Sequence, residues 1–134
     1  MTRHLLVPMD DSEPARTALE HALSLFPDDE ITVVHAVDDL AAGYTGTPTA
    51  QEGEAVNPEL FADVERLADE YGADVEIAVI GGAPPEAILE YADDHAVDQI
   101  VMGSEGRTGV SRMLLGSIAE GVARRASVPV TIVR

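Results

Sequence analysis

Residues 4–37 read HLLVPMDDSEPARTALEHALSLFPDDEITVVHAV, and this pattern predicts a strand, a helix and a second strand in succession. Residues 4–9 are a short apolar run with a proline near its end, a position that suits a strand terminus. Residues 10–14 supply a helix N-cap and a first-turn proline, and apolar side chains then recur at helical spacing over residues 13–26. Residues 31–37 are apolar and β-branched, as is typical of a strand.

The rest of the chain repeats this alternation. The pattern predicts further strands at 75–80, 99–102 and 128–133, and further helices at 58–71, after Pro84 and Pro85, and before the last strand. Near-continuous apolar strands that are separated by helices indicate a parallel sheet covered on both faces. We therefore expect one doubly wound α/β domain over residues 1–134.

Residues 38–57 depart from this pattern. They lack hydrophobic periodicity and are rich in Gly, Thr and Ala. A loop of about 20 residues in a compact domain is usually either functional or disordered. Between disorder in the absence of a ligand and an ordered lid, the composition favours disorder.

The composition excludes several classes of protein. The chain has no cysteine, which excludes disulfides, cysteine-based zinc sites and thiol catalysis. It also lacks lysine, which excludes the P-loop motif and Schiff-base chemistry. No apolar run approaches the length of a membrane span, and the first residues lack the basic and apolar regions that are typical of a signal peptide. We expect a cytoplasmic protein.

The charge is strongly negative and unevenly distributed. Asp and Glu total 25 against 8 arginines, for a net charge of −17, so we expect no binding to nucleic acid or anionic membranes. Such an acidic, lysine-free surface favours an origin in the salty cytosol of a halophile. Residues 1–102 carry 3 arginines and 23 acidic residues, whereas residues 103–134 carry 5 arginines and 2 acidic residues. The final quarter is therefore positive. Either its helix and strand are partly buried and so carry few acidic residues, or the positive charge serves to bind an anion.

The segment after the fourth predicted strand favours the anion. Residues 103–109 contain three glycines, which let a backbone turn its N–H groups toward a negative group. Ser117 and Glu120 match a capping box, so we expect the last helix to begin with Ser117 as its N-cap. The unfilled N–H groups of that helix, with Arg107 and Arg112 in the preceding loop, would bind phosphate. The alternative is a flexible glycine turn before an ordinary capped helix.

The topology predicts where a ligand would lie. Open α/β sheets bind ligands at the carboxyl ends of their strands, where the strand order reverses. The residues that this rule places there are 8–10 after the first strand, 36–38 after the second, and 102–103 after the fourth.

The glycine spacing resembles a known family. Gly103-x2-Gly106-x9-Gly116-Ser117 is similar to the G-x2-G-x9-G-[ST] signature of universal stress proteins that bind ATP. The resemblance covers the whole chain, including residues 33–36 and residues 128–133.

The resemblance implies a fold and a site. The fold would be a five-stranded parallel sheet of order 3-2-1-4-5, of the adenine nucleotide α-hydrolase-like class. The function would be that of an ATP-binding regulatory protein of the stress response. The implied nucleotide-binding residues are Pro8, Met9 and Asp10 at the nucleoside, Ala36 near the adenine, Met102 and Gly103 under the ribose and phosphates, and Gly106, Gly116, Ser117 and Ile118 around the triphosphate. Family members commonly form homodimers through their last strands, here through Val128, Val130 and Ile132, which would also cover an apolar edge.

One residue departs from the family pattern. The family often has histidine where this chain has Glu105, and a carboxylate repels a triphosphate unless the two share a divalent cation. We therefore expect ATP to bind with Mg²⁺ or Mn²⁺, and Glu105 is a candidate ligand. No general base is evident, so hydrolysis would be slow at most. The alternative is a dimeric interaction protein of the same fold without nucleotide, which Glu105 favours and Arg107 and Arg112 oppose.

The sequence does not support two other functions, a phospho-accepting receiver domain and a histidine metal site. Asp10 and Asp11 resemble the acidic pair of a phospho-accepting receiver domain, but that function needs an aspartate after the third strand and a lysine after the fifth, and the chain has neither. The four histidines lie on different predicted elements without metal-ligand spacing, so we expect them to fill structural positions. They are His4, His21, His35 and His95.

Overall fold

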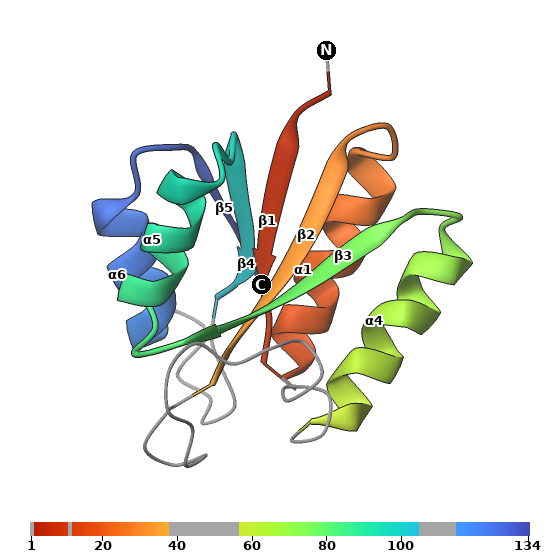
Figure 1. The fold of residues 1–134 in the computed structure, drawn as a ribbon, viewed down its shortest axis with the longest axis horizontal. Helices are drawn as coiled ribbons and strands as arrows, with labels where there is room; N and C mark the ends of the chain where they lie inside the picture. Colours follow the sequence, from red (N-terminus) through yellow and green to blue (C-terminus); the bar gives the residue numbers. More distant parts are fainter. Residues whose placement is uncertain (1, 11, 38–56, 105–114) are drawn as a thin grey trace.

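The computed structural model describes residues 2–10, 12–37, 57–104 and 115–134, and it contains a five-stranded sheet of order β3-β2-β1-β4-β5 (Figure 1). Every pair of neighbouring strands is parallel. The strand order reverses between β1 and β4, which defines the switch point at which open sheets bind ligands. Both the fold class and the strand order that the family resemblance implied are confirmed. The strands are β1 (His4–Pro8), β2 (Glu30–Val37), β3 (Val75–Gly81), β4 (Gln99–Gly103) and β5 (Val130–Val133).

Helices cover both faces of the sheet. Helices α1 (Glu13–Leu25) and α4 (Pro58–Glu70) lie on one face, and α5 (Glu86–Asp94) and α6 (Ser117–Arg125) lie on the other (Figure 1). Successive strand residues point to opposite faces, so each strand supplies two hydrophobic cores. In β1, Val7 packs in the core under α1 and α4, and the adjacent Leu6 packs in the core under α5 and α6. Both side chains are fully buried.

The helix ends follow the local signals in the sequence. Ser12 caps α1, because its hydroxyl oxygen accepts a hydrogen bond of 3.3 Å from the Ala15 N–H. Asn57 caps α4 in the same way, with Oδ1 accepting from the Leu60 N–H at 3.3 Å, so this last residue of the predicted 38–57 loop belongs to the helix cap. Gly72 ends the same helix in the left-handed conformation, at φ +62°. The rest of that predicted loop, residues 38–56, lies outside the described residues.

The last strand is shorter than its apolar pattern suggested. It covers Val130–Val133 and not residues 128–133, because Pro129 has no N–H to donate to a strand ladder. The Pro129 carbonyl still accepts a hydrogen bond of 2.9 Å from the Ile100 N–H. Across the described residues, no helix combines the length and the apolar character that a membrane crossing requires.

Candidate functional site

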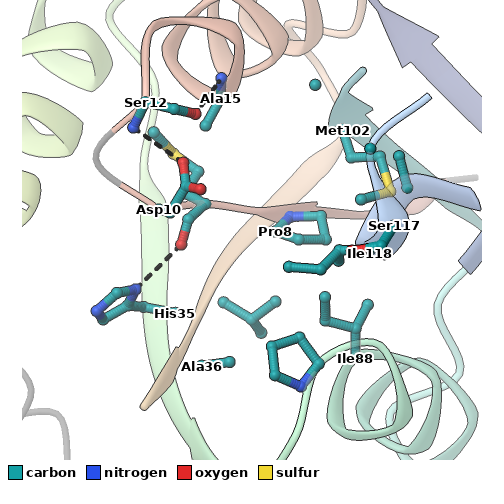
Figure 2. A pocket seen from close by; sticks show the side chains of 16 residues that line it. Pro8, Asp10, Ser12, Ala15, His35, Ala36, Ile88, Met102, Ser117 and Ile118 are labelled. Carbon is teal, nitrogen blue, oxygen red and sulfur yellow. Dashed lines mark hydrogen bonds between the residues drawn. The ribbon is translucent and has the colours of Figure 1, made fainter. Parts of the chain in front are cut away.

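A pocket of about 440 Å³ opens at the carboxyl edge of the sheet, at the switch point between β1 and β4. Strand ends of β1, β2 and β4 line it from the sheet side, and the first turns of α1, α5 and α6 surround it (Figure 2). It is the position that the strand order predicts for a ligand.

Most of the nucleotide-binding residues that the resemblance implied line this pocket. The predicted residues that line it are Pro8, Met9, Asp10, Ala36, Met102, Gly103, Gly116, Ser117 and Ile118. They come from four separate segments of the chain, and folding brings them to one edge. The predicted residues Gly106, Arg107 and Arg112, and the candidate metal ligand Glu105, lie outside the described residues.

One wall of the pocket is apolar. The buried side chains of Val34 and Ile88 line it, together with Ala36 and Pro84. Ala36 and Ile88 are labelled in Figure 2. Sequence reasoning missed Pro84 and Ile88, although it placed a helix after the two prolines. Helical periodicity identifies Ile88 as a core residue, but no local signal reveals that the start of α5 lies beside the end of β2. An apolar wall of this kind suits a flat, weakly polar group such as a nucleobase.

The N-terminus of α6 also opens into the pocket. Gly116 is the N-cap, and no side chain in the described part of the chain caps this helix. The first hydrogen bond of the helix runs from the Glu120 N–H to the Gly116 carbonyl at 2.9 Å. The N–H groups of Ser117, Ile118 and Ala119 therefore precede the helical ladder, and all three residues line the pocket. Such a helix end attracts a negative group.

The predicted capping box is wrong. Ser117 is the first helical residue and not the N-cap, and Glu120 pairs with Arg124 at 2.8 Å and does not return to the helix start. The physical reason lies in a contact with the end of β4. The Gly116 N–H donates to the Ser104 carbonyl at 2.7 Å, and the Ser104 N–H donates to the Val133 carbonyl at 2.9 Å. These bonds hold Gly116 in the cap position, so its missing side chain leaves the helix end open.

A polar rim lies at the end of β1. The Asp10 carboxylate accepts a hydrogen bond of 2.9 Å from the Ser12 N–H, which fixes its orientation at the pocket edge (Figure 2). Among the described residues, Asp10 is the one carboxylate that lines the pocket. Its carboxylate can accept a hydrogen bond from a hydroxyl group of a ligand. The sequence analysis used Ser12, within residues 10–14, only as part of a helix N-cap, yet Ser12 also lines the pocket.

His35 also lines the pocket, and sequence reasoning treated it as a structural residue. Only 9% of His35 is exposed, and its Nδ1 lies 3.0 Å from the Met9 carbonyl. Because a carbonyl only accepts, Nδ1 carries the proton of this bond. The Met9 N–H in turn donates to the Val34 carbonyl at 2.8 Å. His35 therefore fixes the backbone where β1 enters the pocket, a structural role beside the ligand space.

Gly103 combines a place in the pocket with a packing requirement. A Cβ atom at this position would lie 2.7 Å from the Pro14 carbonyl carbon and 2.8 Å from its oxygen. Real Cβ atoms essentially never approach so closely. The first glycine of the sequence motif is therefore needed for the close approach of β4 to the start of α1, whatever occupies the pocket.

Comparisons with known proteins agree with this architecture. The model of the universal stress protein family matches residues 1–134. Universal stress protein MJ0531 of Methanocaldococcus jannaschii is 30% identical to the chain over 141 residues, which cover 98% of the chain and 82% of that protein. The solved structure of MJ0577, from the same organism, has a TM-score of 0.76 at 31% identity and covers 99% of the chain and 96% of its own. A universal stress protein in complex with cAMP has a TM-score of 0.74 at 27% identity, with 98% and 97% covered.

Proposed function

The chain belongs to the universal stress protein family, and on that premise we propose that it binds an adenine nucleotide at the carboxyl edge of its sheet. The observation that carries the proposal is the N-terminus of α6, which opens without a side-chain cap into a pocket that also has an apolar wall. A nucleotide has the matching shape, since it joins an apolar base to a phosphate. The cAMP complex of a 27% identical universal stress protein supports this class of ligand.

The base and the phosphate would occupy different ends of the pocket. The base would lie against Val34, Ala36 and Ile88, and the phosphate would accept from the N–H groups of Ser117 and Ile118. Asp10 would accept from a ribose hydroxyl at the rim.

ATP is the nucleotide that we propose. The 103–117 segment carries Gly106, Arg107 and Arg112, whose backbone and guanidinium groups would neutralise the two phosphates beyond the first. Mg²⁺ or Mn²⁺ would accompany these phosphates. The phosphates and Glu105 would be its ligands, since Mg²⁺ is commonly held by one or two carboxylates together with phosphates. The bound ion would screen the repulsion between Glu105 and the phosphates.

The regulatory role would use a homodimer. Strand β5 pairs with β4 on one side, and its Val130 and Ile132 side chains are only partly buried. Pairing of two copies along this edge, with Val128 beside it, would cover the apolar surface of an edge strand. The hydrogen bond between Ser104 and Val133 connects that strand to the start of α6, so the nucleotide and the dimer would influence each other. Of the lining side chains that could act as a base, we assign Asp10 to the ribose, and His35 Nδ1 donates to the Met9 carbonyl; we propose that the nucleotide acts as a signal.

Titration calorimetry with adenosine, AMP and ATP tests the proposal, with the salt concentration held constant. AMP should bind at least about tenfold more tightly than adenosine, because hydrogen bonds to a charged group contribute about 1.5–3 kcal/mol. ATP should bind more tightly than AMP in Mg²⁺, and EDTA should weaken ATP binding but leave AMP binding unchanged. Absence of binding by all three ligands would refute the proposal and favour an interaction protein that holds no nucleotide.

A further inference from the structure

The two helices that flank the pocket touch at one unusually close point. A Cβ atom on Gly121 of α6 would lie 2.6 Å from Pro85 Cγ and 3.5 Å from Pro85 Cβ. The shorter distance is far below an ordinary carbon–carbon contact, which is about 3.5–4.0 Å. The chain therefore accommodates the Pro85 ring only because residue 121 has no side chain.

This contact lies directly behind the pocket. On α6, Gly121 follows Ser117 by four residues and Ile118 by three, so all three lie on one side of the helix. On α5, Pro85 is the N-cap, the neighbouring Pro84 lines the pocket, and Ile88 lines it one turn later. The contact thus joins the apolar wall of the pocket to its anion-binding end.

An ion pair crosses the same junction. Arg125 lies one turn after Gly121, and its guanidinium lies 3.1 Å from a carboxylate oxygen of Glu86 on α5. The Arg125 Nε also donates to the Gly121 carbonyl at 3.4 Å. A Cβ at residue 121 would lie 3.6 Å from this guanidinium as well as against Pro85. The distance to the guanidinium is an ordinary van der Waals contact, so the collision of a side chain there would be with Pro85.

Glycine is otherwise a poor choice at this position. In a helix interior it destabilises a protein by about 0.5–1 kcal/mol relative to alanine. Gly121 lies inside α6, and its φ is outside the left-handed region that would require glycine. The close approach of Pro85 is the feature of the described structure that accounts for it.

We propose that Gly121 is a positioning residue that sets the distance between the base-binding wall and the phosphate-binding end of the pocket. It touches no ligand and acts through Pro85. The pocket would then select ligands by the length of the connection between base and phosphate. This inference rests on the proposed nucleotide function, because it assigns one end of the pocket to each part of the ligand.

The test compares AMP with its homologue that has one extra methylene between ribose and phosphate. In the wild-type protein the fixed spacing should make the homologue bind at least about tenfold more weakly, since displacements near 1 Å are costly in a fitted site. In Gly121→Ala the added methyl group should push α5 and α6 apart. AMP should then lose about tenfold in affinity, and the ratio of the two dissociation constants should fall to about threefold or less.

Two control variants separate spacing from general damage. Ile88→Val removes a methyl group from the apolar wall without changing the helix contact, so both ligands should weaken in parallel. Arg124→Ala removes an exposed side chain of the same helix together with its ion pair to Glu120, away from Pro85, and should leave the ratio of the two affinities unchanged. Thermal unfolding measures the stability of each variant. If Gly121 has a purely structural role, Gly121→Ala should lower the Tm but leave the ratio of the two dissociation constants unchanged.

The outcomes are distinct. If wild-type protein binds neither of these ligands nor ATP, the nucleotide proposal fails, and this inference fails with it. If it binds ATP but neither of these two ligands, this inference alone is wrong. If wild-type protein binds AMP and its homologue within threefold of each other, the spacing is not fixed and this inference alone is wrong; this arm does not depend on the folding of any variant. An unchanged ligand ratio in folded Gly121→Ala would also overturn it.

Discussion

Replacing Gly103 with alanine should strongly lower the free energy of unfolding, and the contacts around Gly103 indicate the size of the loss. The new Cβ would meet three atoms of Pro14: the carbonyl carbon at 2.7 Å, the oxygen at 2.8 Å and Cβ at 2.9 Å. Two of these are backbone atoms in the first turn of α1, which the Ser12 cap holds in place. They cannot move aside as the end of a flexible side chain could.

The cost should therefore lie at the upper end of the range for overpacked cores, about 3 kcal/mol in the free energy of unfolding. For a domain of this length, that loss corresponds to a fall in Tm of about 10 °C. Urea denaturation followed by circular dichroism measures it, and the slope of the transition should stay constant while its midpoint moves down.

A matched variant separates collision from backbone strain. A Cβ on Gly72 would have no neighbour within 4 Å, but its φ of +62° is unfavourable for alanine. Gly72→Ala should therefore cost about 1–2 kcal/mol from strain alone. If Gly103→Ala is as stable as wild type within about 0.5 kcal/mol, the packing argument is wrong, and Gly103 is needed only for a ligand.

Four further predictions follow from the site, the surface and the proposed dimer. Gly116→Val should weaken AMP binding more than tenfold with little change in Tm, because the extended backbone of residue 116 (φ −64°, ψ 159°) accepts valine while its side chain blocks phosphate from α6; calorimetry showing wild-type affinity would contradict the site. Asp63→Asn should lower the unfolding free energy at pH 7 by at most about 1 kcal/mol, because Asp63 pairs with Arg16 at 2.7 Å and with Arg66 at 3.5 Å in partly exposed positions. The hydrogen bond from Arg16 holds the pKa of Asp63 below its ordinary value of 3.8, so wild type should keep this advantage at neutral pH and lose it as the pH falls through the lowered pKa; a constant difference down to pH 2 would exclude the ion pair as its source. Raising KCl from 0.1 to about 2 M should increase Tm, because salt screens the repulsion within a chain of net charge −17, and an unchanged or lower Tm would count against adaptation to high salt. Val130→Asp should convert the proposed homodimer to monomers in light scattering, and an unchanged mass would move the interface away from β5.

The sequence predicted the elements of this fold well because each depends on neighbouring residues. Apolar periodicity located the strands and helices within one or two residues, and Ser12 and Gly72 marked helix ends through contacts within their own turn. The predicted capping box was wrong, and there a group distant in the sequence was responsible. Ser117 and Glu120 have the spacing of a capping box, but the Ser104 carbonyl holds Gly116 in the cap position.

The residues of the candidate site were likewise predicted only in part. The glycine spacing and the family resemblance named nine residues that line the pocket, because the motif and its context mark positions on separate segments of the chain. The sequence did not predict that Pro84 and Ile88 line the pocket, because the order of the strands in the sheet determines where α5 lies.

The amino-acid sequence by itself determined the alternation of strands and helices, the acidic surface and the edge of the sheet where a ligand would bind. These follow from local backbone preferences, from the pattern of burial and from the sum of charges. Only the tertiary structure decided which helix end stays open, why residue 103 must be glycine, and how closely α5 approaches α6 at Gly121. Those features depend on atoms that are far apart in the chain, and no local pattern encodes the distance between them.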